Sequence, residues 1–272
     1  MNLLFSINRK FIPLWEQCMA TILRHGGAAH YDLYVLHSDL TGEDGARMQA
    51  ALRPQDSCTL VRVPEGLFEG FPETGRYPVQ IYYRLAAPLL LPEALNRILY
   101  LDVDTVILNS LMPLYTSDFA GAAFMACSHT RKFLDKVNQA RLGLEDGVRY
   151  LNSGVLMMDL ALLRRTLRLE DIRDYAERYK NRLILPDQDI LTGLFGDKAL
   201  VLDSRIYNMT DRLYVRCSAL PSERLSLDWV RQNTVVVHYL GKPKPWQKNY
   251  IGPLGVFYQE ELALTRAAAE EA

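Results

Sequence analysis

The 272-residue chain lacks the features that mark secreted, membrane-spanning and nucleic-acid-binding proteins. Its four cysteines, Cys18, Cys58, Cys127 and Cys217, are widely spaced without a CxxC pair. This spacing predicts reduced thiols in a cytosolic protein and argues against a disulfide scaffold or a zinc site. The chain carries 31 Lys+Arg against 32 Asp+Glu, whereas nucleic-acid-binding proteins usually have a clear basic excess. No apolar run reaches the roughly 18 residues of a membrane-spanning helix, and the N-terminal apolar stretch is too short for a signal peptide.

The sequence also lacks internal repeats, low-complexity segments and any linker rich in Pro, Gly or Ser. Its 49% hydrophobic and 23% charged residues are typical of a globular protein. A chain of this length can bury a full hydrophobic core. We therefore expect a single domain, with Ala267–Ala272 as a frayed helix end.

Short apolar runs alternate with amphipathic stretches in the first part of the chain. Strands are predicted at Leu3–Ile7, Leu33–Leu36 and Thr59–Val63, and a helix at Leu14–Arg24. A second helix is expected after Thr41, which is suited to be its N-cap. This order of elements predicts a parallel sheet with helices on both faces.

Two acidic residues follow the most apolar run. Tyr82–Leu91 is apolar and compatible with a helix, and Ile98–Leu101 is typical of a central strand covered on both faces. Asp102 and Asp104 come next, and side chains two apart on a strand point to the same side. Such a pair suits Mg²⁺ or Mn²⁺ bound to phosphate oxygens, because these cations prefer oxygen ligands. The same pair can also serve only as a turn or a helix cap.

The stretch Leu101–Ile107 also fits the DxDx[TV] motif of haloacid-dehalogenase-like phosphatases, in which Asp102 would be the nucleophile. That family usually carries the motif on its first strand and a paired acidic motif later. Here the motif lies beyond residue 100, and Asp197 and Asp203 have the wrong spacing for the second motif. The phosphatase is therefore the weaker alternative.

Three further segments each have an ordinary structural interpretation when taken alone. Tyr150–Gly154 can form a turn before a buried strand at Val155–Met158. Pro186 suits a helix start, with acidic residues in the first turn. His238–Trp246 reads as a stiff, proline-rich loop after the strand-like run Thr234–Val237.

Taken together, these motifs resemble family 8 of the retaining glycosyltransferases. The segments are YYRL at 82–85, YLDVD at 100–104, LNSG at 151–154, DQDIL at 187–191 and HYLGKPKPW at 238–246. The resemblance implies one Rossmann-like α/β domain of the GT-A fold over residues 1–260, followed by a short tail at 261–272. Its central sheet would be mostly parallel, with helices on both faces.

The resemblance also implies a site for a UDP-sugar and a divalent cation. Asp102, Asp104 and His238 would hold Mn²⁺, with Mg²⁺ as the alternative, since an imidazole ligand favours Mn²⁺. Arg84 would help to fix the nucleotide, and Lys244 would bind the diphosphate. The full implied donor-binding set is Asn8, Arg84, Asp102, Val103, Asp104, Asn152, Ser153, Asp187, Gln188, Gly241 and Lys244.

Asp187 and Gln188 are the implied catalytic residues. Gln188 would lie nearest the anomeric carbon, on the face opposite UDP. Because an amide is a poor nucleophile, we favour front-face attack by the acceptor hydroxyl over a covalent intermediate. We also expect the acids to gather on one side of the cleft, with Arg84 and Lys244 on the other.

Two positions depart from the family pattern. Asn8-Arg9-Lys10-Phe11 stands where many members have Asp-x-Asn-Tyr near the uracil or ribose, so the effect on base recognition is open. His129 replaces an acid found in several bacterial members. The donor can therefore be UDP-galactose or UDP-glucose.

The sequence thus predicts a retaining hexosyltransferase that modifies a saccharide acceptor, lipid-linked or free, in bacterial lipopolysaccharide synthesis. We expect a cytoplasmic protein with at most a weak peripheral contact at the inner membrane face, and no nucleic-acid partner. A non-catalytic protein that binds nucleotide sugars is the third alternative. The acceptor, the linkage and the oligomeric state are not predicted.

Overall fold

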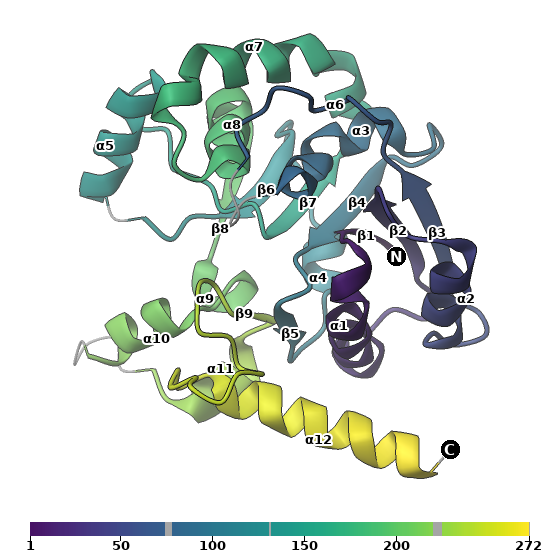
Figure 1. The fold of residues 1–272 in the computed structure, drawn as a ribbon. Coiled ribbons are helices and arrows are strands. Elements are labelled where there is room, and N and C mark those ends of the chain that lie inside the picture. Colours follow the sequence, from purple (N-terminus) through teal and green to yellow (C-terminus); the bar gives the residue numbers. More distant parts are fainter. Residues whose placement is uncertain (74–77, 131, 220–224, 272) are drawn as a thin grey trace.

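A seven-stranded mixed β-sheet runs through the centre of the protein (Figure 1). The computed structural model describes residues 1–73, 78–130, 132–219 and 225–271. The strand order is β3-β2-β1-β4-β7-β6-β8, and only β7 runs antiparallel to both of its neighbours. The expected mostly parallel sheet is confirmed. The strands of this sheet are β1 (Asn2–Ser6), β2 (Asp32–His37), β3 (Ser57–Arg62), β4 (Arg97–Leu101), β6 (Phe124–Cys127), β7 (Val155–Asp159) and β8 (Ala199–Leu202).

Alternating apolar side chains give the sheet two buried faces. Along β4, Ile98 and Tyr100 join one hydrophobic cluster, whereas Leu99 and Leu101 join the other. The helices expected on both faces are confirmed. One face is covered by α1 (Ile12–His25), α2 (Gly42–Ala50) and α4 (Met112–Tyr115). The other is covered by the 3₁₀ helix η2 (Val79–Ala86) and by α3 (Ala87–Leu90), α6 (Leu160–Thr166), α7 (Leu169–Tyr179) and α8 (Pro186–Phe195).

A second, two-stranded sheet lies beside the main one. It pairs β5 (Thr105–Ile107) with β9 (Val236–His238) in antiparallel register. Its outer side carries a third apolar cluster, to which α10 (Asp211–Ser218), α11 (Leu227–Asn233) and α12 (Gly255–Glu271) contribute. The remaining elements are α5 (Lys132–Leu142), α9 (Ser204–Tyr207) and the 3₁₀ helices η1 (Arg9–Phe11), η3 (Lys180–Arg182) and η4 (Gly196–Lys198).

Local sequence signals act as expected at two helix starts. The Thr41 hydroxyl accepts a hydrogen bond from the Asp44 amide, and the Asp44 carboxylate accepts one from the Thr41 amide. This reciprocal capping box satisfies N–H groups that have no partner within the helix. Pro186 stands in the first turn of α8, where its missing N–H costs no helical hydrogen bond.

The helix-compatible stretch Tyr82–Leu91 is helical up to Leu90, but as two helices of different type. A 3₁₀ helix ends at Ala86, and a short α-helix with Pro88 in its first turn begins at Ala87. A continuous α-helix would need a hydrogen bond from residue 88 to the Arg84 carbonyl, which proline cannot donate. The Ala87 amide makes that bond instead.

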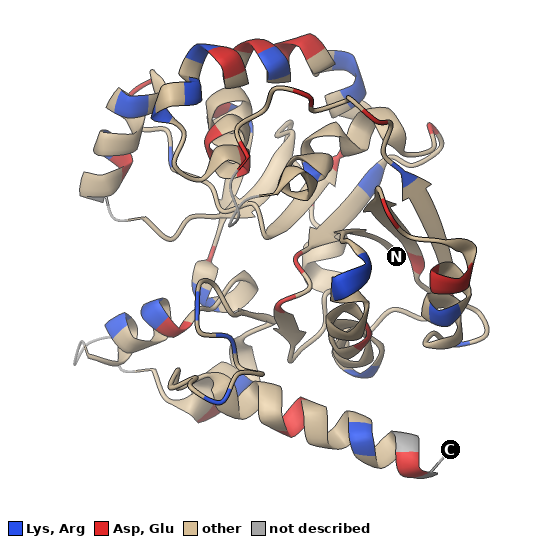
Figure 2. Cartoon of the chain, in the orientation of Figure 1, with Lys and Arg blue, Asp and Glu red and all other residues tan. Residues whose placement is uncertain are grey.

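The C-terminal helix α12 contains most of the expected tail, and Ala272 lies outside the described residues. The expected domain boundary between residues 260 and 261 falls inside this helix, where Glu261 bonds to Arg24 and His25 of α1. Within the described ranges, none of the helices is long and apolar enough to cross a bilayer. Figure 2 shows Lys and Arg interleaved with Asp and Glu along α7, so positive and negative charges are mixed on the surface of this helix.

Candidate metal centre

The two acids of the DxD motif lie in a bend between β4 and β5, and not on a strand as expected. The Thr105 hydroxyl donates to the Asp102 carbonyl at 2.8 Å, and the Tyr239 amide donates to the Asp104 carbonyl at 3.0 Å. The bend, and not strand alternation, therefore sets the direction of the two carboxylates.

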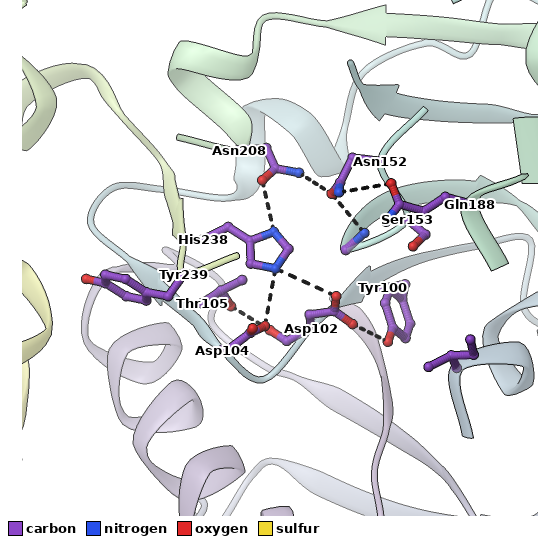
Figure 3. A network of polar contacts seen from close by, with 12 residues as sticks. Tyr100, Asp102, Asp104, Thr105, Asn152, Ser153, Gln188, Asn208, His238 and Tyr239 are labelled. Carbon is purple, nitrogen blue, oxygen red and sulfur yellow. Dashed lines mark hydrogen bonds and ion pairs between the residues drawn. The ribbon is translucent and has the colours of Figure 1, made fainter. Parts of the chain in front are cut away.

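The pairing of β5 with β9 brings His238 to these acids. Thr105, which directly follows Asp104, is the register partner of His238. The antiparallel pairing therefore places the imidazole beside the bend, although more than 130 residues of chain separate them. Figure 3 shows His238 directed at both carboxylates from above.

One ligand atom from each of Asp102, Asp104 and His238 lies within 4.8 Å of the others. The His238 Nε2 atom is 3.2 Å from Asp104 Oδ1 and 3.7 Å from Asp102 Oδ2. Neither contact has hydrogen-bond geometry, so within the described chain this buried nitrogen has no hydrogen-bond partner. Two carboxylate oxygens and one imidazole nitrogen, converging without mutual hydrogen bonds, fit a divalent cation.

The glycine of the LNSG segment makes room for this cluster. A Cβ atom at Gly154 would lie 2.2 Å from His238 Cε1 and 2.7 Å from Asp102 Oδ2. The Gly154 carbonyl also accepts a 2.8 Å hydrogen bond from the Asp102 amide. Since β7 is antiparallel to β4, the start of β7 meets the end of β4 at this point. The segment thus packs against the acids because its glycine lacks a side chain.

The ammonium group of Lys244 contacts Asp104 Oδ2 and donates to the Tyr239 carbonyl at 2.6 Å. Burial by itself would raise the pKa of Asp104, but the neighbouring His238 and the ammonium charge of Lys244 hold that pKa well below its ordinary value. Asp104 is therefore a carboxylate at neutral pH, as a metal ligand must be.

Acids and bases in the site are paired, contrary to the expected separation onto two sides. The buried Arg84 guanidinium is 3.0 Å from Asp102 Oδ1 and 3.7 Å from Asp187 Oδ2, and it donates to the Ser153 carbonyl at 2.8 Å. It also stacks over the Tyr100 ring, 4.4 Å from its centroid. Buried charges need partners close by, which explains why the two signs interleave.

Asp187 and Ser153 contact each other as well as Arg84. The Ser153 hydroxyl donates to Asp187 Oδ2 at 2.6 Å. Burial raises the pKa of Asp187 above its ordinary value, although the Arg84 charge and the Ser153 hydrogen bond oppose that shift. Arg84 therefore contacts two acids, Asp102 of the metal cluster and Asp187 in the first turn of α8.

A chain of amides joins the cluster to Gln188 (Figure 3). Asn152 Nδ2 donates to Gln188 Oε1 at 3.4 Å, and Asn152 Oδ1 accepts from Asn208 Nδ2 at 2.8 Å. Asn208 Oδ1 lies 3.0 Å from His238 Nδ1. Sequence reasoning missed Asn208 and the role of the Tyr100 hydroxyl, which donates to Asp102 Oδ1 at 2.6 Å. No spacing signal marks Asn208.

Comparison with known proteins identifies the family to which this chain belongs. The model of glycosyl transferase family 8 matches residues 2–250. The chain belongs to this family. It is 27% identical over 255 residues to a putative glycosyltransferase of Haemophilus influenzae, covering 91% of this chain and 73% of the relative. It is 25% identical to the lipopolysaccharide 1,2-glucosyltransferase of Escherichia coli K12, covering 95% and 76% of the two chains.

A solved structure agrees with this family assignment. The galactosyltransferase LgtC, in complex with donor and acceptor sugar analogues, superposes with a TM-score of 0.82 at 25% identity. The match covers 97% of this chain and 95% of that chain. The GT-A fold and glycosyltransferase activity follow, and the phosphatase and non-catalytic alternatives find no support.

Not every predicted residue of this family 8 protein joins the central network. The Asn8 side chain accepts from the Lys10 amide at 3.1 Å and caps η1; within the described residues it bonds to none of the other predicted groups. Gly241 has a φ of +83° in the loop that carries Lys244. Val103 lies between the two acids and packs against the apolar cluster beneath them.

His129, which departs from the family pattern, supports the site from behind. Its Nε2 atom donates to the Asn208 carbonyl at 2.8 Å. Burial lowers the pKa of His129 to about 4, and the hydrogen bond to Asn208 only partly opposes this shift. His129 is therefore neutral at physiological pH, unlike the acid that the family pattern places there.

Proposed function

We propose that this glycosyltransferase moves galactose or glucose from a UDP-sugar to a saccharide of a bacterial surface glycan, with retention of anomeric configuration. Family membership and the printed activities of two relatives, a lipopolysaccharide glucosyltransferase and a galactosyltransferase, support the hexosyl donor. The observation that carries the proposal is the buried His238 Nε2 atom, which faces two carboxylates without a hydrogen bond in the described chain.

Asp102, Asp104 and His238 are proposed to hold Mn²⁺, with Mg²⁺ as the alternative. A bound divalent cation would supply positive charge that stabilises the departing diphosphate. Lys244 and the backbone near Gly241 would bind the same phosphates from the neighbouring loop, and Lys244 would exchange its contact with Asp104 for one with phosphate. A cation beside the leaving group acts where negative charge grows in the transition state.

The remaining donor contacts follow from position. Arg84 orients Asp102 and Ser153, and we propose that it fixes the nucleotide end through them. Asn8, at the carboxyl end of β1, would contact the base, and Val103 would contribute its backbone beside the acids.

Asn152, Ser153 and Asp187 are proposed to hold the hydroxyls of the donor hexose. Gln188, tied to Asn152 by its carbonyl oxygen, would stabilise positive charge at the anomeric carbon. The acceptor hydroxyl would attack from the face that UDP leaves, and a phosphate oxygen would accept its proton. Gln188→Ala should slow turnover and leave UDP-sugar binding intact. A covalent sugar adduct trapped on a neighbouring residue of that variant would exclude front-face attack.

The proposed function is tested by offering a panel of nucleotide sugars with and without Mn²⁺, and following thermal unfolding and hexose release. UDP with Mn²⁺ should stabilise the protein, since a ligand that binds only the folded state raises its stability. One UDP-hexose should also be slowly hydrolysed. Stabilisation without hydrolysis or transfer would favour a non-catalytic binder, and Mg²⁺-dependent phosphate release from simple phosphoesters would favour a phosphatase.

We further propose a cytoplasmic enzyme whose catalytic domain spans residues 1–260 and whose acceptor is free or lipid-linked. The lipopolysaccharide activity of the Escherichia coli relative supports the acceptor class. Transfer to a soluble saccharide and to the same saccharide on a lipid carrier should be compared directly. Faster transfer to the lipid-linked form in the presence of vesicles would show a peripheral membrane contact.

A further inference from the structure

The buried amide of Asn208 is placed where it controls the protonation pattern of His238. Asn208 follows α9 and is fully buried. Its backbone amide donates to the Ser204 carbonyl at 3.2 Å, and its carbonyl accepts from His129 at 2.8 Å. The backbone of Asn208 is therefore held from both sides, and its side chain bridges Asn152 and His238.

The orientation of this bridge follows from one unambiguous donor. The Gly154 backbone amide points at the side-chain atom of Asn152 named Oδ1, at 3.1 Å. A backbone N–H can only donate, so this atom must be the oxygen of the Asn152 amide. The Asn208 atom that lies 2.8 Å from the same oxygen must then be the amide nitrogen.

The other end of the Asn208 side chain is consequently its oxygen, and it lies 3.0 Å from His238 Nδ1. An amide oxygen accepts, so Nδ1 of the imidazole must carry a proton. A neutral imidazole has only one ring proton, which leaves Nε2 with a bare lone pair. That nitrogen is the buried atom facing Asp102 and Asp104.

We propose that Asn208 is a positioning residue that fixes His238 in the Nδ1–H tautomer and so presents Nε2 to a divalent cation. The inference rests on the proposed metal site and goes beyond it, since Asn208 belongs to none of the recognised sequence motifs. Hydrogen-bond partners of ligating histidines commonly set ring tautomer and orientation in metalloproteins. Here the order Gly154–Asn152–Asn208–His238 transmits the direction of one backbone N–H to a metal ligand.

Two substitutions separate this role from simple packing. Asn208→Leu has similar volume and removes the acceptor for Nδ1–H. Asn208→Asp keeps an acceptor at that position and loses the donation to Asn152. A tautomer effect predicts that the two variants differ, whereas a packing or stability effect gives no reason for the aspartate to preserve the tautomer.

The first measurement uses metal-free protein with ¹⁵N-labelled histidine. The chain has five histidines, and loss of a signal in His238→Asn assigns the ring. At the alkaline plateau of a pH titration, the wild type and Asn208→Asp should show the Nδ1–H tautomer. Asn208→Leu should move toward the Nε2–H form. A wild-type ring in the Nε2–H form, or a leucine variant with an unchanged tautomer, would overturn the inference.

The second measurement is Mn²⁺ binding by calorimetry in the presence of UDP. Asn208→Leu should weaken Mn²⁺ binding by about 10- to 100-fold, the usual effect of losing such a partner. Asn208→Asp should stay closer to the wild type. Equal weakening in both variants would overturn the role of the tautomer. If the wild type holds the Nδ1–H tautomer and binds no Mn²⁺, the proposed metal site fails while the tautomer assignment stands. If the leucine variant fails to fold, a wild-type ring in the Nε2–H form, or an aspartate variant that loses the Nδ1–H form, still overturns the inference.

Discussion

Adding one methyl group at Gly154 should disable the candidate metal centre. The Cβ of Gly154→Ala would lie 2.2 Å from His238 Cε1, 2.9 Å from His238 Nδ1 and 2.7 Å from Asp102 Oδ2. Carbon atoms in contact stay about 3.5 Å apart, so the ring must withdraw by about 1.3 Å. Metal–ligand distances hold to within about 0.2 Å, and a displacement of this size removes the histidine ligand.

The expected effect divides into a stability part and a binding part. Overpacking a buried position costs about 1 to 3 kcal/mol. Binding is read from the rise in Tm on adding UDP and Mn²⁺ at 100 times the wild-type Kd. That excess stabilises the folded state by about 2.7 kcal/mol, which is worth about 5 to 10 °C for a chain of this size. Gly154→Ala should lose most of that shift.

Gly42→Ala provides the matched control, because a Cβ at Gly42 would meet nothing within 4 Å. Gly42 opens α2, where alanine suits the backbone. This variant should keep the full ligand-induced shift. If Gly154→Ala also keeps the full shift, the metal does not bind where His238 and Asp102 meet, and the steric reasoning is refuted.

Three further predictions concern the groups around the acids. Tyr100→Phe removes the hydroxyl that donates to Asp102 Oδ1 at 2.6 Å. Because a hydrogen bond to a charged group contributes about 1.5 to 3 kcal/mol, calorimetry should show the Mn²⁺ affinity reduced about tenfold. Unchanged affinity would mean that Arg84 alone orients Asp102. Lys244→Gln frees Asp104 Oδ2 from its ammonium partner. Binding of Mn²⁺ alone should therefore be retained or strengthened, while UDP binding measured with Mn²⁺ present should weaken. Equal loss of both would contradict a diphosphate role for Lys244. Burial lowers the pKa of His129 to about 4 in the folded state, against about 6.5 when the chain is unfolded. Between these two pH values, His129 is protonated in the unfolded chain and neutral in the folded chain. Stability should therefore fall as pH drops from 6.5 to 4, by up to about 3 kcal/mol, and urea unfolding at pH 7 and pH 4.5 should show a smaller fall in His129→Gln; an identical fall would place the titrating group elsewhere.

Six of the strands were predictable from the sequence, because burial of a sheet leaves a local apolar pattern, whereas β5, β6 and β8 were not predicted. The apolar runs Leu3–Ile7 and Ile98–Leu101 predicted strands, and both form strands within one residue of the predicted bounds. The capping box after Thr41 and the proline at the start of α8 are likewise local chemistry. The helical stretch within Tyr82–Leu91 changes from 3₁₀ to α at Ala87 because Pro88 cannot donate to the Arg84 carbonyl, which the apolar pattern alone cannot show.

The site was predictable as a set of residues but not as a geometry. The sequence by itself determined that Asp102, Asp104 and His238 carry the residue types that a divalent cation prefers. Only the tertiary structure decided that β5 pairs with β9, and this register delivers the histidine to the acids. Register is a property of two distant segments, so no local pattern contains it.

The charges of the protein show the same contrast between what the sequence determines and what the structure decides. A nearly neutral total of 31 basic and 32 acidic residues follows from composition alone. The structure decided that Arg84 stands between Asp102 and Asp187 and that Lys244 covers Asp104, because burial forces opposite charges into contact. The place of Asn208 was likewise fixed by folding alone. A single asparagine has no recognisable pattern in the sequence. Asn208 gains a role only because folding places its amide between Asn152, which accepts from the Gly154 amide, and the imidazole of His238.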